Sequence, residues 1–125
     1  MNPLIDPLMN PLMEPKNTPN ALRIMVVDDN LDAASTTAML LEMYGHSVRV
    51  AHSGEMALAG ARLAVPQVFL LDIGLPGIDG FELARQLRAA PETTNATLVA
   101  LTGYDRAEDR QRALDAGFDL TFANR

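Results

Sequence analysis

Carboxylates follow two apolar runs of this chain, in a pattern typical of residues placed where buried strands end. Asp72 comes directly after Val-Phe-Leu-Leu, and Asp28 and Asp29 come directly after Ile-Met-Val-Val. A hydroxyl, that of Thr102, ends a third apolar run. Because a charge cannot stay unpaired inside an apolar strand, we expect each carboxylate to lie at the end of its strand.

Three carboxylates at one edge of a sheet would repel each other unless a cation neutralises them. A hard cation is expected with oxygen ligands, and Mg²⁺ suits best because it keeps several waters and takes only one or two carboxylates. A carboxylate that contacts Mg²⁺ beside a hydroxyl is a suitable place for phosphoryl transfer, with the carboxylate attacking phosphorus. Plainer interpretations exist for each residue. Asp28 and Asp29 also suit a helix N-terminus, Asp72 a turn and Thr102 an ordinary strand end.

The elements that must position these side chains alternate strictly between strand and helix. Strands are predicted at 23–27, 47–51, 68–72, 97–102 and 120–123. Helices are predicted over about 31–44, over 54–64, from near 81, and over 105–116. This order predicts an α/β fold, a flavodoxin-like, doubly wound, five-stranded parallel sheet with strand order 2-1-3-4-5. The first and third strands are then neighbours about 5 Å apart, so their carboxylates meet.

Burial and capping roles follow from the same pattern. The strand before Asp72 is predicted to be buried on both faces, as strands of parallel sheets are. Asn30 or Asp29 can cap the first helix, and Asp79 is expected to be a cap or turn residue before Gly80. Residues expected to face solvent are His46, His52, Glu82, Arg85 and Arg88.

Composition limits the class of protein. The chain has 125 residues, of which 48% are apolar and 21% charged, which suits one globular domain. The formal net charge of −6 argues against nucleic acid as a direct partner. No cysteine is present, so disulfides and thiolate metal sites are excluded. No run reaches transmembrane length and no secretory signal pattern opens the chain, so we expect no membrane partner and a cytoplasmic location.

Residues 1–20 form a separate region in which proline recurs every four residues, from Pro3 to Pro19. Each proline removes an amide donor and fixes φ, so a helix is excluded and a flexible leader or linker is expected. The region is nevertheless unusually apolar for a free tail, so docking on an apolar surface is a second interpretation. The apolar residues are Leu4, Ile5, Leu8, Met9, Leu12 and Met13.

Three ordered blocks resemble the receiver domains of two-component response regulators. They are Val-Val-Asp-Asp-Asn at 26–30, Leu-Leu-Asp-Ile-Gly-Leu-Pro-Gly-Ile-Asp-Gly at 70–80 and Leu-Thr-Gly at 101–103. The similarity extends to Asp-Ala-Gly-Phe-Asp at 115–119 and covers roughly 22–120. The order of motifs is also similar to receiver modules attached to hybrid histidine kinases. Residues 21–125 would form the receiver domain.

This resemblance implies a role for each residue of the site. Asp72 would be the phosphoacceptor and Thr102 the switch hydroxyl. The Mg²⁺ ligands would be Asp29 and Asp72 directly, Asp28 mostly through water, and the backbone carbonyl of Gly74. Pro76 and Gly77 would shape the loop. The implied partners are a histidine kinase or phosphotransfer protein and an unknown output protein, and the implied domain promotes its own phosphorylation without being a turnover enzyme.

The fifth strand departs from the family pattern. Where the family has a lysine, usually followed by proline, this chain has Asn124 and Arg125. At about 4 Å and an effective dielectric constant of about 20, a unit charge pair is worth about 4 kcal/mol, so the lost charge matters. The aromatic switch position is occupied by Thr121, with Phe122 one residue out of phase. A β-bulge would realign both Phe122 and Arg125.

The family's final helix has no counterpart after the fifth strand, which would leave an apolar patch beside the first helix uncovered. Three interpretations stay open: the domain is truncated or diverged at its C-terminus, it dimerises through the uncovered side, or the proline-rich segment folds over the gap.

Two further functions compete with a phosphorylated receiver. A phosphorylation-defective pseudo-receiver, acting as a protein-interaction module, would explain Asn124 and Thr121. A phosphatase of the haloacid-dehalogenase type fits poorly, because it usually has a second aspartate where this chain has Gly74.

Overall fold

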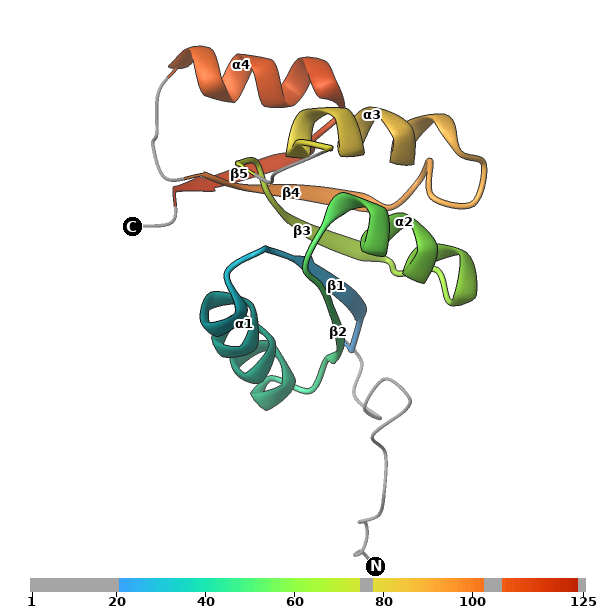
Figure 1. Ribbon diagram of the computed structural model, residues 1–125, viewed down its shortest axis with the longest axis vertical. Helices are drawn as coiled ribbons and strands as arrows, with labels where there is room; N and C mark the ends of the chain where they lie inside the picture. The colour runs from blue at the N-terminus through green and yellow to red at the C-terminus, as the bar shows by residue number, and fades with distance from the viewer. Residues whose placement is uncertain (1–20, 75–77, 103–106, 124–125) are drawn as a thin grey trace, which may run out of the picture.

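The computed structural model describes residues 21–74, 78–102 and 107–123, in which strands and helices alternate along the chain (Figure 1). The strands are β1 (Arg23–Val27), β2 (Ser47–Ala51), β3 (Val68–Asp72), β4 (Thr97–Thr102) and β5 (Leu120–Ala123). The helices are α1 (Leu31–Met43), α2 (Gly54–Leu63), α3 (Gly80–Ala89) and α4 (Ala107–Ala116). Residues 1–20, and with them the predicted leader, lie outside the described part.

All five strands are parallel, and their order in the sheet is β2-β1-β3-β4-β5. The predicted flavodoxin-like fold and strand order are therefore confirmed. Among the described residues β5 is the last element, and no final helix is present. None of the described helices is both long enough and apolar enough to cross a membrane.

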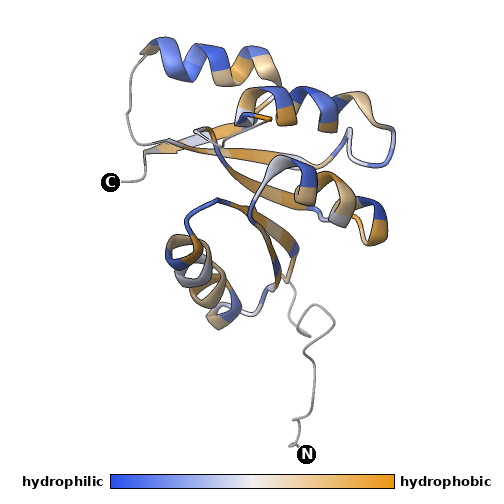
Figure 2. Cartoon of the chain, in the orientation of Figure 1, coloured by the Kyte–Doolittle hydropathy of each residue, from blue (hydrophilic) through white to orange (hydrophobic). Residues whose placement is uncertain are grey.

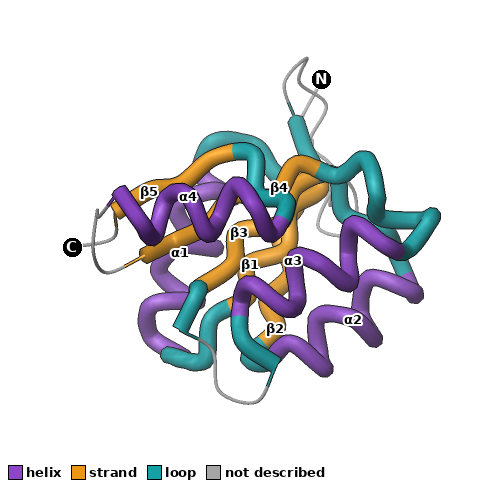
Figure 3. The backbone as a smooth tube through the Cα atoms, turned by 90° about the horizontal axis from the view of Figure 1, so that it is seen from above, coloured by secondary structure: helices purple, strands orange, loops and turns teal. Residues whose placement is uncertain are grey.

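The helices cover the two faces of the sheet unequally. Helices α2, α3 and α4 lie on one face, and α1 lies on the other (Figure 1). Figure 3 shows the same layers from above, with the strands side by side beneath α2, α3 and α4. The apolar strands run through the middle of the molecule (Figure 2).

The main hydrophobic core lies between the sheet and the three-helix layer. It includes Phe69 and Leu71 of β3, each fully buried, and Leu83 and Leu87 of α3. A smaller cluster lies under α1, where Ala34 packs against Ile24 and Val26.

The expectation that β3 is buried on both faces is wrong for two of its four apolar residues. Phe69 and Leu71 are buried, but Val68 and Leu70 are only half-buried. The reason is the unequal helix cover, because α1 packs over β1 and β2 and does not span the remaining strands.

Side-chain caps fix the starts of the helices at the edge where the strands end. Asn30 caps α1 and accepts a hydrogen bond from the Ala33 N–H at 2.9 Å. Asp79 caps α3 and accepts from the Glu82 N–H at 2.8 Å, as its position before Gly80 predicts. Because Asn30 caps α1, the carboxylate of Asp29 is not needed for that role.

Candidate functional site

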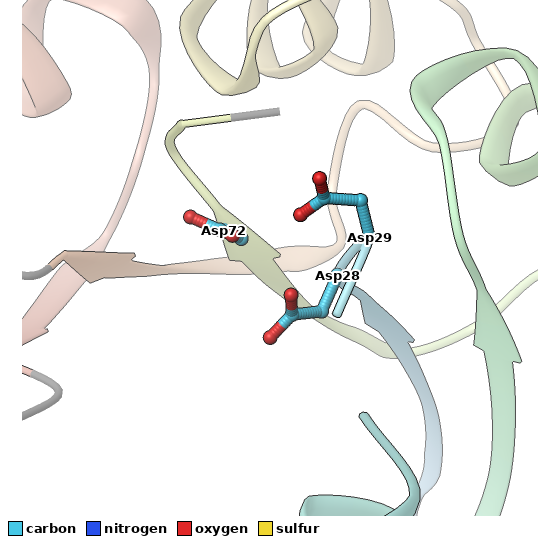
Figure 4. A group of neighbouring side chains, drawn as sticks. All are labelled: Asp28, Asp29 and Asp72. Carbon is cyan, nitrogen blue, oxygen red and sulfur yellow. The ribbon is translucent and has the colours of Figure 1, made fainter. Parts of the chain in front are cut away.

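The register of the sheet brings the three predicted carboxylates together. Val27 of β1 is paired with Leu71 of β3, so Asp28 and Asp72 occupy equivalent positions at the ends of neighbouring strands. Asp28, Asp29 and Asp72 each offer a carboxylate oxygen, and these oxygens all lie within 4.8 Å of one another (Figure 4). The strand order predicted from the sequence is sufficient to produce this cluster.

The three carboxylates differ in their contact with solvent. Asp28 is 5% exposed, Asp72 is half-buried and Asp29 is exposed. The Asn30 N–H donates a hydrogen bond to Oδ1 of Asp28 at 3.0 Å. The Asp28 N–H donates to the Ala51 carbonyl at 3.0 Å, which holds the end of β1 against β2. The carboxylate of Asp28 is therefore held in place on the buried side of the site, while Asp29 and, in part, Asp72 are accessible to solvent.

The environment of Asp72 disfavours its negative charge. Burial is the main cause that raises the pKa of this carboxyl, and the nearby carboxylates of Asp28 and Asp29 raise it further. A hydrogen bond from the Gly74 N–H to Oδ1 of Asp72, at 3.0 Å, acts in the opposite direction. A cation among these oxygens would therefore relieve a repulsion that the fold builds in.

The donor set suits a hard divalent cation such as Mg²⁺. It consists of carboxylate oxygens only, close enough together to share one ion, and two of the three residues are open to solvent and so leave room for water ligands. Gly74 lies in the turn that follows Asp72. Its backbone carbonyl as a further ligand stays a prediction.

Close packing around Gly80 positions the turn after Asp72. A Cβ atom at Gly80 would lie 2.6 Å from Cα of Ile73 and 2.9 Å from the Asp72 carbonyl oxygen. The Gly80 N–H also donates to the Ile73 carbonyl at 3.1 Å. Only glycine fits here, so α3 begins directly against the exit of β3. Pro76 and Gly77, predicted to shape the loop, lie outside the described residues.

Two histidines lie deeper than the sequence analysis predicts. Both are half-buried, and each contacts backbone at the margin of β1. Nδ1 of His52 lies 3.1 Å from the carbonyl oxygen of Asp28, and Nδ1 of His46 accepts from the Leu22 N–H at 3.0 Å. The sequence could have indicated this burial, because both histidines flank β2, which is the neighbour of β1 in the sheet.

Thr102 is the last residue of β4 and is half-buried at the same edge of the sheet. Its neighbour Leu101 is the register partner of Asp72, so Thr102 follows directly in the adjacent strand. This is the side of the site where the resemblance places a switch hydroxyl. The role itself stays a prediction.

The fifth strand pairs one-for-one with β4, from Val99 with Leu120 to Thr102 with Ala123. The bulge that would realign Phe122 is therefore absent from the described part of β5. Phe122 is 59% exposed and Thr121 half-buried. Asn124 and Arg125 lie outside the described residues.

Comparison with known proteins assigns this architecture. A family model for the response regulator receiver domain matches residues 24–123. The gliding motility regulatory protein of Myxococcus xanthus is 37% identical over 98 residues, which are 78% of this chain and 13% of that protein. Protein PilH of Pseudomonas aeruginosa is 36% identical over 88 residues, covering 70% of this chain and 73% of PilH.

A solved structure agrees with these sequence matches. The CheY-like response regulator receiver domain protein from Methanospirillum hungatei superposes with a TM-score of 0.73 at 29% identity. The match covers 80% of this chain and 78% of that one. The chain thus spans most of PilH and of this neighbour, but only a small part of the Myxococcus protein.

Proposed function

Because this chain belongs to the response regulator receiver domain family, we propose that it accepts a phosphoryl group on Asp72 from a histidine kinase or a phosphotransfer protein. The single observation that carries the proposal is the cluster of Asp28, Asp29 and Asp72 at the end of β3. Among these carboxylates, Asp72 is the last residue of the central strand, and burial raises its pKa.

The transfer is a displacement at phosphorus. An Oδ atom of Asp72 forms the new O–P bond while the P–N bond to the donor histidine breaks, and the imidazole nitrogen keeps the bonding electron pair. Mg²⁺, when bound, supplies positive charge that offsets the charge on the phosphoryl oxygens. Asp29 and Asp72 would bind it directly, Asp28 mostly through water, and Gly74 through its backbone carbonyl.

The chain's own residues prepare Asp72 for this step. The Gly74 N–H holds Oδ1 at 3.0 Å, which orients the carboxylate and favours its charged form. Thr102 would move toward the phosphoryl group and carry the change to a protein partner. The domain would act in the cytoplasm as a phosphorylated switch and not as a turnover enzyme.

A second candidate is a phosphorylation-defective receiver that binds partners constitutively. Three features of the fifth strand and the residues after it favour this candidate. Thr121 occupies the aromatic switch position, and the regular pairing of β5 with β4 leaves Phe122 exposed and out of that position. Asn124 stands where the family has a lysine. A partner affinity that stays the same with and without Mg²⁺ and phosphodonor would support this candidate over the first.

Intact-mass spectrometry after incubation with acetyl phosphate and Mg²⁺ separates the two. The parent chain is expected to gain the mass of one phosphoryl group, and Asp72→Asn is expected to gain none. Asp79→Asn is the matched control, because Asp79 lies in the same connection, caps α3, and can be replaced by another good capping residue. A folded parent that gains no mass would overturn phosphorylation and leave the constitutive module.

A further inference from the structure

A cavity of about 400 Å³ lies where β1 and β2 begin, at the edge of the sheet opposite the acidic cluster. Two segments line it. One is the first part of the two strands, with Arg23, Ser47 and Arg49, and the other is the connection from α2 to β3, with residues 64–66. This volume is in the range of cavities that hold small organic ligands.

Two arginine side chains of the cavity converge on the same stretch of backbone. Nε of Arg23 donates to the Val65 carbonyl at 3.4 Å, and Nη2 of Arg49 donates to the Ala64 carbonyl. Nη2 of Arg49 also donates to the Gly60 carbonyl at 3.2 Å, near the end of α2. Because Ala64 and Val65 are consecutive residues, the two guanidinium groups are held beside one another.

These contacts with backbone use only part of each guanidinium. A guanidinium has five N–H donors, and a cation near a helix C-terminus is favourable, so Arg49 supports the end of α2 through Nη2. Within the described part of the chain, Nη1 and Nη2 of Arg23 and Nε and Nη1 of Arg49 form no hydrogen bond. The hydroxyl of Ser47 forms none there either. The cavity therefore has several donors that a ligand could use.

The cavity concentrates positive charge in an acidic chain. Neither Arg23 nor Arg49 forms an ion pair with another described residue. The described residues that line the cavity include no carboxylate, although the whole chain has a formal net charge of −6. Two cations held side by side attract an anion more strongly than one does, so an anionic ligand is favoured.

The two guanidinium groups suit a phosphate ester better than a carboxylate. One guanidinium can bind either group through two parallel N–H···O bonds. A carboxylate has two oxygens and one negative charge, which a single guanidinium satisfies. A phosphate monoester has three terminal oxygens and up to two negative charges, which match two guanidinium groups. The apolar residues Ala64, Val65 and Pro66 line the same cavity and suit the organic part of such an ester.

We propose that this cavity reversibly binds the phosphate ester of a small organic molecule. The phosphate lies between Arg23 and Arg49, and the apolar part of the molecule lies against residues 64–66. The proposal does not depend on phosphorylation of Asp72, because the cavity and the acidic cluster share no residue and lie at opposite edges of the sheet.

Titration with phenyl phosphate tests the proposal, followed by amide NMR of the isotope-enriched chain. The buffer contains no Mg²⁺ and has a pH near 8, above the second pKa of about 6 of a phosphate ester. The amide signals of Ser47, Ala64 and Val65 are expected to shift along one saturable curve, while that of Gly74 beside Asp72 stays in place. No shift of the three amides up to about 10 mM ligand would overturn the proposal.

A matched pair of arginine variants tests the site. Arg23→Gln removes an exposed guanidinium and keeps the backbone hydrogen bonds that join Arg23 to Gln67, so the fold is retained. We expect it to raise Kd for phenyl phosphate at least about tenfold. Arg62→Gln removes an exposed guanidinium from the last turn of α2, outside the cavity, and should change Kd less than about twofold. Equal losses in both variants would reduce binding to general charge attraction and overturn the site.

Two further ligands test the chemical class. Inorganic phosphate lacks the apolar part and benzoate lacks the second charge, so each is expected to bind at least about fivefold more weakly than phenyl phosphate. Inorganic phosphate that binds as tightly as phenyl phosphate would contradict an organic ester. Benzoate that binds as tightly would contradict the preference for phosphate.

Discussion

Carboxylates are paired with a positive charge at one edge of the sheet and clustered together at the other. At the edge where the strands begin, Oδ2 of Asp119 lies 2.7 Å from a guanidinium nitrogen of Arg88 and also accepts from the Leu98 N–H at 2.8 Å. At the edge where the strands end, Asp28, Asp29 and Asp72 face one another within 4.8 Å. The negative charge of Asp119 is thus neutralised by Arg88, whereas three negative charges lie together at the opposite edge.

Arg88 shows what the first arrangement achieves. Besides Asp119, its guanidinium donates to the carbonyls of Thr94, Ala96 and Gly117. One side chain therefore joins α3 to the α3–β4 connection and to the α4–β5 connection. At the acidic edge, Asp28 and Asp72 each accept a hydrogen bond from the backbone two residues further along the chain, so these bonds join no distant segments. The comparison teaches that the charges at the first edge hold the fold together, whereas those at the second repel one another and raise the pKa of Asp72.

The largest expected effect comes from breaking the neutral edge. Arg88→Met keeps an aliphatic side chain but removes the donor to three carbonyls and one of the two donors to Oδ2 of Asp119. Allowing for partial exposure of the pair, we expect the free energy of unfolding to fall by about 2–3 kcal/mol, measured by urea denaturation. Arg85→Met, which removes an exposed pair with Glu82, is the control and should change it by no more than about 0.5 kcal/mol. Equal losses in both variants would contradict the special role of Arg88.

Filling the acidic edge should have an intermediate effect. Mg²⁺ at ten times its dissociation constant is expected to add about 1.4 kcal/mol to the free energy of unfolding, because the unfolded chain has no such cluster. Asp29→Asn should lose most of this gain and Asp79→Asn should keep it. If NaCl at matched ionic strength stabilises the parent equally, the effect is screening and not binding at the site.

The smallest expected effect comes from removing one like charge without metal. The pKa of Asp72 is raised in the folded chain, so its charged form destabilises the fold at neutral pH. In metal-free buffer Asp72→Asn should therefore be more stable than the parent, by at most about 1 kcal/mol because the group is half-exposed. The raised pKa of Asp72 sets both the sign of this stability difference and the pH range in which it appears. The difference should be largest above the folded pKa and should shrink as the pH falls toward the usual value of 3.8. A less stable variant at neutral pH would contradict the electrostatic account.

Much of the acidic edge could be predicted from the sequence, because its geometry depends on strand order. Strict alternation favours that order, and because Asp28 follows β1 and Asp72 ends β3, the order places these two carboxylates together. The capping role of Asp79 was predictable for the same local reason. The close approach of Gly80 to Ile73 was not, because it depends on how α3 packs against the strand.

The neutral edge could not be predicted in this way. Arg88 occupies a helix position that faces outward by periodicity, yet its long side chain folds back to groups up to 31 residues away. The half-burial of Val68 and Leu70 was missed for a related reason, since it depends on which helices are present over β3. Local pattern identifies which residues share a face, but not what covers that face.

The most direct test of the central claim maps the phosphoryl group to a residue. The chain is incubated with acetyl phosphate, with and without Mg²⁺, then reduced with borohydride, which converts an aspartyl phosphate to homoserine, and digested for peptide sequencing by mass spectrometry. The account predicts homoserine at position 72 alone, and only where Mg²⁺ was present. Modification at Asp28 or Asp29, or an equal yield at position 72 without Mg²⁺, would contradict it.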